Sequence, residues 1–189
     1  MAYDKTYLRK KFLLKRKKKY LIASKFNFDL IYKLIGKHFF KRKILIAGYY
    51  PSSHEVDIFN FLKKSSKKKF KIALPVSKNS NLMSFKKWDT KNPLYVSKFG
   101  TLEPERKQKN ILPDLIIVPL VAFDKQLNRI GYGKGYYDRC LKEIKRTKKN
   151  SISLGVAHSF QKCKNIPINK YDFKLDYIFT EQGIISSNK

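Results

Sequence analysis

The stretch PDLIIVPLVAFD at residues 113–124 constrains the fold of this chain more than any other segment. Seven of the eight residues at 115–122 are apolar, and the exception is Pro119. A short, continuous apolar run is typical of a strand that is covered on both faces of a parallel sheet. Since proline has no N–H to donate to a strand ladder, Pro119 weakens the case for an unbroken strand. The run therefore predicts a buried central strand with helices on both sides of its sheet.

Strands and helices are expected to alternate along the rest of the chain, which is typical of an α/β domain with a mainly parallel sheet. Further strands are expected at 43–50, 70–76, 82–88, 152–157 and 175–180. Helices are expected at the N-terminus, from Ser24 to a stop at Gly36, at 51–64 and after residue 135. The stretch at 102–110 is expected to be a loop. No internal repeat is visible. The 189 residues fit one domain of ordinary size, so we expect a single domain over residues 1–189.

Two of the expected helices carry polar residues at informative spacings. Lys5, Arg9 and Arg16 recur at spacings of four and seven residues, which places them on one face of the N-terminal helix. Ser52 and Glu55 have the spacing of a capping box at the start of the helix expected at 51–64. Cations are therefore expected to project together from the first helix. For Glu55, the structural interpretation is a carboxylate that caps its helix.

The net charge of +29 invites a nucleic-acid-binding function, because clustered basic residues neutralise phosphates. Only seven of the 43 basic residues are arginine, and the chain is also rich in Ile, Phe, Tyr and Asn, whose codons are rich in A and T. A drift of the whole genome toward such codons would make almost any of its proteins basic. A nucleic-acid-binding protein that uses its twelve tyrosines for base stacking stays an alternative, although no recognisable binding module is present. We expect no nucleic-acid partner.

Targeting and metal-binding signals are weak. No run of about 18 apolar residues appears, and the first twenty residues are too basic for the apolar segment of a signal peptide. Cys140 and Cys163 lie too far apart for a metal-binding pair, and the three histidines have no ligand spacing. We therefore expect a cytoplasmic protein without membrane contact or zinc, in which both cysteines are buried or incidental thiols.

The run RIGYGKGYYDR at residues 129–139 is the strongest candidate for a functional site, because it holds three of the chain's eight glycines within five positions. Glycines let a backbone adopt positive φ and approach a ligand closely, and the free N–H groups of such a loop and of a following helix bind phosphate oxygens. Arg129 and Lys134 would add positive charge, and Asp138 is placed to hold a magnesium ion that bridges phosphates.

The spacing of these glycines is not that of a P-loop or of a dinucleotide-binding fingerprint. A glycine-rich turn that joins a strand to a helix, with Tyr136 and Tyr137 packed in the core, is therefore the structural alternative. On the residues alone, both readings stay open.

The run at 128–139 resembles the sequence signature of the 5-formyltetrahydrofolate cyclo-ligase family, whose members are also called methenyltetrahydrofolate synthetases. Other segments follow in the order that the family shows, and the resemblance covers nearly the whole chain: Lys5, Arg9, EVD at 55–57, ALP at 73–75, MSF at 83–85, EP at 103–104, the run at 113–124, Pro167 and Asp172. Ile58 departs from the threonine that many members carry, which puts local helix packing in doubt more than chemistry.

The resemblance implies a three-layer α/β/α sandwich of the ribose-phosphate isomerase and CoA transferase-like kind. It also implies an ATP- and magnesium-dependent closure of 5-formyltetrahydrofolate to 5,10-methenyltetrahydrofolate, with release of ADP and phosphate. We expect a monomer that acts on 5-formyltetrahydrofolate with or without a polyglutamate tail. A different phosphotransferase on a related sheet stays a further alternative.

The resemblance also assigns roles to individual residues. Arg129 and Lys134 would be catalytic, because they would neutralise charge on the transferring phosphoryl group. ATP would be bound by Lys5, Arg9, Arg129, Gly131, Tyr132, Gly133, Lys134, Gly135, Tyr136 and Tyr137. The folate would contact Tyr50, Glu55 and Tyr137, and magnesium would be held by Asp138 and Asp172. Lys5 as a solvated lysine and Asp172 as a turn residue are the structural alternatives.

Overall fold

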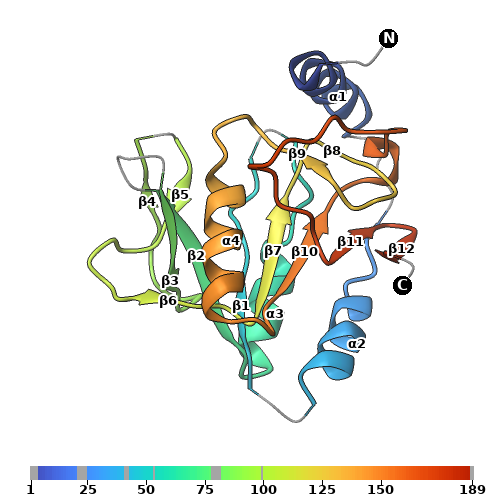
Figure 1. Ribbon diagram of the computed structural model, residues 1–189. Helices are drawn as coiled ribbons and strands as arrows, with labels where there is room; N and C mark the ends of the chain where they lie inside the picture. The colour runs from blue at the N-terminus through green and yellow to red at the C-terminus, as the bar shows by residue number, and fades with distance from the viewer. Residues whose placement is uncertain are drawn as a thin grey trace.

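The computed structural model describes residues 4–20, 25–40, 43–52, 54–77, 82–98 and 100–187. A mixed sheet of eight strands crosses the molecule in the order β12-β11-β10-β7-β1-β2-β3-β6 (Figure 1). Its strands are β1 (Leu45–Ala47), β2 (Lys71–Ser77), β3 (Met83–Lys87), β6 (Asn110–Ile111), β7 (Leu115–Pro119), β10 (Ile152–Val156), β11 (Tyr177–Thr180) and β12 (Gly183–Ser186). The five central strands, from β11 to β2, pair in parallel, whereas β12, β3 and β6 pair antiparallel at the two sides. The prediction of an α/β fold with a mainly parallel sheet is confirmed.

Helices cover both faces of this sheet. Alternate residues of β7 point to opposite faces, so that Leu115 and Ile117 belong to one core cluster while Ile116 and Val118 belong to another. Helices α2 (Asp29–His38) and α3 (Phe59–Lys67) pack in the first cluster, and α4 (Tyr136–Thr147) packs in the second. Figure 1 shows α4 in front of the sheet and α3 behind it. No helix in the described part of the chain has the length and apolar character needed to cross a membrane.

The long apolar run at 113–124 forms two strands and not one. β7 ends at Pro119, and the chain then enters a separate antiparallel hairpin of β8 (Ala122–Phe123) and β9 (Arg129–Ile130). The missing N–H of Pro119 explains the break, because a ladder cannot continue through it. Helix α1 (Lys5–Lys19) packs Leu8 and Phe12 on this hairpin. The break therefore creates the platform on which the first helix lies, at the top of Figure 1.

The helix expected at 51–64 begins later than predicted. Residues 54–58 form no helix, α3 starts at Phe59, and the Oδ1 atom of Asp57 accepts a hydrogen bond from the Phe59 N–H at 2.7 Å. The predicted capping box is therefore wrong: Glu55 precedes α3 and does not cap it. The predicted N-cap Ser24 lies outside the described residues, and α2 continues through Gly36 to His38.

The remaining predictions agree with the structure apart from their bounds. The segment at 82–88 contains β3, and the expected loop at 102–110 contains the short strand β5 (Leu102–Glu103), which pairs with β4 (Tyr95–Val96), and the start of β6. Both cysteines are half-buried and unpaired, as expected.

Candidate active site

A cavity of about 860 Å³ lies where the central strands end and α4 begins. Its walls include Pro75 near the end of β2, Pro119 at the end of β7 and the loop at 131–135. Every residue that the sequence assigned to a site lines this cavity, including the distant residues Lys5 and Asp172. Ligands of α/β proteins bind at this edge of the sheet, because loops pass there from strands into helices.

The glycine loop connects β9 to α4. Gly133 has φ of 100° and Gly135 has φ of 64°, values that favour glycine, and Gly135 is the N-cap of α4. Gly131 does not adopt a positive φ. The expectation that the three glycines allow positive φ is therefore wrong for Gly131. Within the described part of the chain, the peptide N–H groups of Gly133 and Gly135 donate to no backbone carbonyl. These donors are therefore left for a ligand at the positive end of the α4 dipole.

Helix α1 places two cations against this loop. The Arg9 Nε–H donates to the Gly131 carbonyl at 2.8 Å, and a Cβ atom added at Gly133 would lie 3.3 Å from Arg9 Cζ. Lys5, one turn earlier on the same face, forms an ion pair with Asp172. The helical spacing of Lys5 and Arg9 thus brings both charges to the cavity.

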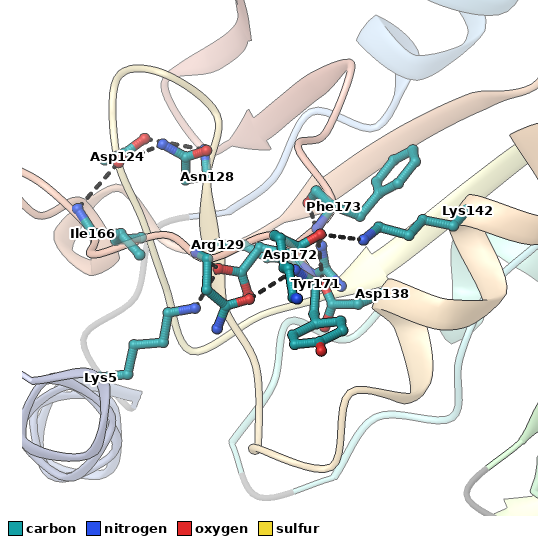
Figure 2. A network of polar contacts seen from close by, with 12 residues as sticks. Lys5, Asp124, Asn128, Arg129, Asp138, Lys142, Ile166, Tyr171, Asp172 and Phe173 are labelled. Atoms are coloured by element: carbon teal, nitrogen blue, oxygen red, sulfur yellow. Dashed lines mark hydrogen bonds and ion pairs between the residues drawn. The ribbon is translucent and has the colours of Figure 1, made fainter.

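Arg129 is buried and fixes the wall beside the loop. It donates from Nη2 to Asp138 Oδ1 at 2.9 Å and from Nη1 to the Phe173 carbonyl at 2.7 Å, while the Phe173 N–H donates to the same Asp138 oxygen at 3.0 Å. Burial lowers the pKa of Arg129, and the neighbouring Asp138 carboxylate opposes that shift. Figure 2 shows Arg129, Asp138 and Phe173 as one network with Lys5 and Asp172. This network joins β9, the first turn of α4 and the segment at 169–173.

Asp124 shapes the turn that delivers Arg129. Its Oδ1 atom accepts hydrogen bonds from the N–H groups of Gln126 and Asn128. Its Oδ2 atom accepts from Asn128 Nδ2 at 3.0 Å and from the Ile166 N–H at 3.2 Å, and Figure 2 shows Asp124 between Asn128 and Ile166. Asp124 is buried, so these four donors compensate the loss of water around its carboxylate. The sequence analysis did not identify this residue.

The two predicted magnesium ligands both line the cavity. Each is already in an ion pair, Asp138 with Arg129 and Asp172 with Lys5, and Asp172 also accepts a hydrogen bond from the Asn169 N–H at 2.7 Å. Within the described residues, no group of three or more His, Cys, Asp and Glu side chains gathers to hold a metal ion. A magnesium ion that is bound largely by nucleotide phosphates needs only one or two carboxylates, and the two aspartates match that requirement.

Glu55 is buried at another wall of the cavity, where it contacts the more exposed residues Ser52 and Tyr132. Its Oε2 atom accepts hydrogen bonds from the Ser52 N–H at 2.9 Å and from Ser52 Oγ at 3.3 Å, while Oε1 accepts from the Tyr132 hydroxyl at 2.9 Å. Arg16 of α1 in turn donates from Nη2 to the Tyr132 hydroxyl oxygen. Burial raises the pKa of Glu55, and its hydrogen bonds and Arg16 oppose this shift.

Aromatic side chains form much of the remaining wall. Tyr49 donates to the Val56 carbonyl at 2.8 Å, and the ring of Tyr50 meets that of Phe59 edge-on at 5.5 Å. The buried hydroxyl of Tyr137 has no hydrogen-bond partner among the described residues, and burial raises its pKa strongly. Arg139 donates to the Lys134 carbonyl at 2.6 Å and thereby holds the glycine loop from α4.

Arg16, Ser52 and Tyr49 complete this site, although the sequence analysis assigned none of them to it. For Arg16 a signal existed, because the analysis placed it on the same helical face as Lys5 and Arg9. For Ser52 the interacting pair was recognised but was interpreted as a helix cap.

Comparison with known proteins gives consistent results. A 5-formyltetrahydrofolate cyclo-ligase from Haemophilus influenzae is 39% identical over 87 residues, which cover 44% of this chain and 46% of that protein. The chain thus matches about half the length of that relative. A 5-formyltetrahydrofolate cyclo-ligase from Mycoplasma genitalium is 31% identical over 184 residues, which cover 93% of this chain and 96% of that protein.

The solved structures point the same way. The NMR structure of Aquifex aeolicus 5,10-methenyltetrahydrofolate synthetase has a TM-score of 0.75 and 31% identity, and the match covers 98% of this chain and 93% of that one. The family model for the 5-formyltetrahydrofolate cyclo-ligase family matches residues 2–181. Because this match spans nearly the whole chain, the protein belongs to the 5-formyltetrahydrofolate cyclo-ligase family.

Proposed function

We propose that this protein uses ATP and magnesium to convert 5-formyltetrahydrofolate to 5,10-methenyltetrahydrofolate, with release of ADP and phosphate. One observation carries the proposal: a glycine loop with free peptide N–H groups shares a single cavity with the buried carboxylate Glu55. The loop, Lys5, Arg9 and Arg129 suit a triphosphate, while Glu55 and the tyrosines suit a polar, aromatic pterin. Family membership supports the same activity.

The chemistry explains why ATP is needed. A formamide carbon is a poor electrophile, and its oxygen is a poor leaving group. Attack of the formyl oxygen on the γ-phosphorus breaks the bond to ADP and turns that oxygen into a phosphate leaving group. N10 then attacks the formyl carbon and loses its proton, the carbon–oxygen bond breaks, phosphate departs, and the methenyl bridge between N5 and N10 is complete.

Such phosphoryl transfer requires mainly position and positive charge from the protein. In our proposal the N–H groups of Gly133 and Gly135 bind phosphate oxygens, and Arg9 holds the loop while its charge faces the nucleotide. Lys134 and Arg129 neutralise the charge on the transferring group. Two of the five N–H donors of the Arg129 guanidinium are engaged by Asp138 and Phe173, which leaves donors for a phosphate oxygen.

Magnesium would lie beside Asp138 and Asp172 and would supply charge neutralisation at the phosphates. Both described contacts of Asp138 fall on Oδ1, so its other oxygen is suited to an ion. The remaining expectations, a monomer that works in the cytoplasm on mono- or polyglutamylated folate, stay predictions.

A direct assay tests the proposed function. The near-ultraviolet absorbance of the methenyl product should rise when the protein is mixed with ATP, magnesium and 5-formyltetrahydrofolate, and should stay flat when any one of the three is omitted. Absence of product under all conditions would contradict the proposal. If the protein then bound polynucleotide with an affinity that fell steeply with salt, the nucleic-acid-binding alternative would gain support.

A further inference from the structure

A chain of three polar side chains crosses the site from α1 to the segment before α3. Arg16 donates to the Tyr132 hydroxyl oxygen, and that hydroxyl donates to Glu55 Oε1 at 2.9 Å. The three residues come from three distant parts of the sequence. Tyr132 belongs to the glycine loop, so the loop that would bind phosphate is also in contact with the carboxylate on the other wall.

Arg16 is one of the most deeply buried side chains in the described structure, with 1% exposure. Its described acceptors are both neutral, the Leu120 carbonyl at 3.3 Å from Nη1 and the Tyr132 hydroxyl, and its Nε atom has no partner among the described residues. A guanidinium stays charged at the pH of any cell, and a buried charge needs a counter-charge. Glu55 is suited to provide that charge through the hydroxyl of Tyr132, because burial raises the pKa of Glu55 while its hydrogen bonds and Arg16 oppose that shift.

Tyr132 is suited to transmit this interaction. Burial and the Glu55 charge raise its pKa to about 12, so its hydroxyl keeps its proton and remains a donor to Glu55. The other groups around Glu55 are Ser52 from its own segment, Tyr49 after β1 and Tyr137 of α4. Both tyrosines have pKa values raised by burial, so neither supplies a charge at neutral pH. Among the described residues, Arg16 is the cation that opposes the effect of burial on Glu55.

We propose that Tyr132 and Arg16 are positioning residues that keep Glu55 ionised and correctly oriented toward the folate. The glycine loop thus has a second role besides phosphate binding, because its Tyr132 side chain positions the Glu55 carboxylate for the folate. The kinetic part of this proposal rests on the proposed folate activity, whereas the ionisation of Glu55 does not depend on it.

The decisive variant is Tyr132→Phe, which keeps the ring and removes the hydroxyl. The Glu55 carboxylate is followed by ¹³C NMR during a pH titration, and its signal is identified by its absence in Glu55→Gln. We expect the midpoint for Glu55 to rise by about one pH unit, because a tenfold change in proton affinity corresponds to the loss of one bond to a charged group. Tyr95→Phe, at an exposed tyrosine on β4, is the control and should leave the midpoint unchanged.

Steady-state kinetics provides the second readout. We expect the KM for 5-formyltetrahydrofolate to rise about tenfold in Tyr132→Phe. The KM for ATP should change by less than about twofold, because the variant keeps the Tyr132 ring and the peptide N–H groups of the loop and removes only the hydroxyl that contacts Glu55. An unchanged Glu55 midpoint together with an unchanged folate KM would overturn the proposal, even if the variant melted at a lower temperature.

A second variant, Arg16→Lys, tests the proposal independently in case Tyr132→Phe does not fold. Arg16→Lys keeps a cation but loses the fork that reaches both acceptors, and it should also raise the Glu55 midpoint. The wild-type midpoint in this variant would count against the proposal. If the wild-type protein does not convert the folate at all, the proposed function fails, and the NMR titration still decides whether Tyr132 and Arg16 control Glu55.

Discussion

The buried Arg129 and the half-buried Asp138 form an ion pair, 2.9 Å between Nη2 and Oδ1, that joins β9 to the first turn of α4. The pair sits directly beside the glycine loop, so its geometry sets the position of the loop's last residues. The Phe173 N–H shares the same carboxylate oxygen at 3.0 Å. Asp138 is thus held in place by two hydrogen-bond donors, and the side-chain oxygen of an asparagine could accept from both of them.

Replacement of Asp138 by asparagine should therefore reduce turnover while preserving the fold. The amide oxygen still accepts from Phe173, but the charge that would bind magnesium and balance Arg129 is gone. We expect kcat to fall about 100-fold or more, as for other losses of charge stabilisation at a reacting group. Asp29→Asn, at an exposed position in the first turn of α2, is the control. Wild-type turnover at saturating magnesium would remove Asp138 from the site.

Replacement of Arg9 by alanine should weaken ATP binding. The side chain donates to the Gly131 carbonyl, and its guanidinium would lie 3.3 Å from a Cβ atom added at Gly133. We expect the KM for ATP to rise about tenfold, with a smaller change in the KM for folate. Lys10→Ala changes an exposed neighbouring cation and should leave both constants as they are. A wild-type KM for ATP in Arg9→Ala would instead assign Arg9 to a purely structural contact.

Gly133→Ala tests the conformation of the loop. Its φ of 100° is unfavourable for alanine, and the new methyl group would lie 3.3 Å from Arg9 Cζ. We expect a loss of about 1–3 kcal/mol in the free energy of unfolding together with reduced activity. Gly36→Ala in α2, where an added Cβ atom would meet no atom within 4 Å beyond the backbone of its own helix, should be neutral or should stabilise the protein by up to about 1 kcal/mol. Equal stability of the two variants in urea unfolding would contradict the described loop.

His158 predicts how stability depends on pH. It is buried and stacks on the Phe160 ring at 5.0 Å, and its ring nitrogens have no hydrogen-bond partner within the described chain. Burial lowers its pKa below the ordinary value of 6.5, with Arg16 acting in the same direction and Glu181 opposing it. Between the folded and the unfolded pKa, the unfolded chain binds a proton that the folded chain does not. The contribution of His158 to stability is therefore fully present above pH 6.5 and is lost as the pH falls toward the pKa of His158 in the folded protein.

The variant His158→Phe isolates this contribution. Below the ordinary histidine pKa, the wild-type free energy of unfolding should fall faster than that of the variant by at most about 1.4 kcal/mol per pH unit. Urea unfolding at several pH values measures both slopes. Parallel slopes would show that His158 does not titrate differently in the two states.

Local patterns predicted the sheet and the glycine loop but not the segment around Glu55. The apolar runs revealed the central strands because a strand covered on both faces needs no polar residue, and the missing donor of Pro119 marked where β7 ends. The pair of Ser52 and Glu55 was recognised at the correct spacing. It was interpreted as a helix cap because a local pattern cannot reveal that Tyr132 and Arg16, distant in sequence, hold the same carboxylate.

Arg16 also shows that a local pattern cannot reveal a contact between distant segments. Its helical spacing placed it with Lys5 and Arg9, but only the packing of α1 on the β8–β9 hairpin distinguishes a buried guanidinium from a solvated one. The ion pair of Asp172 with Lys5 likewise depends on how the segment at 169–173 returns to α1. Such contacts arise from tertiary structure and have no local signal.

The central claim is that ATP activates the formyl oxygen in the cavity beside the glycine loop. The most direct measurement uses 5-formyltetrahydrofolate labelled with ¹⁸O in its formyl group, together with ATP, magnesium and the protein, and analyses the released phosphate by mass spectrometry. The account predicts that the phosphate carries the label, one ¹⁸O atom for each methenyl group formed. Methenyl product accompanied by unlabelled phosphate would contradict it.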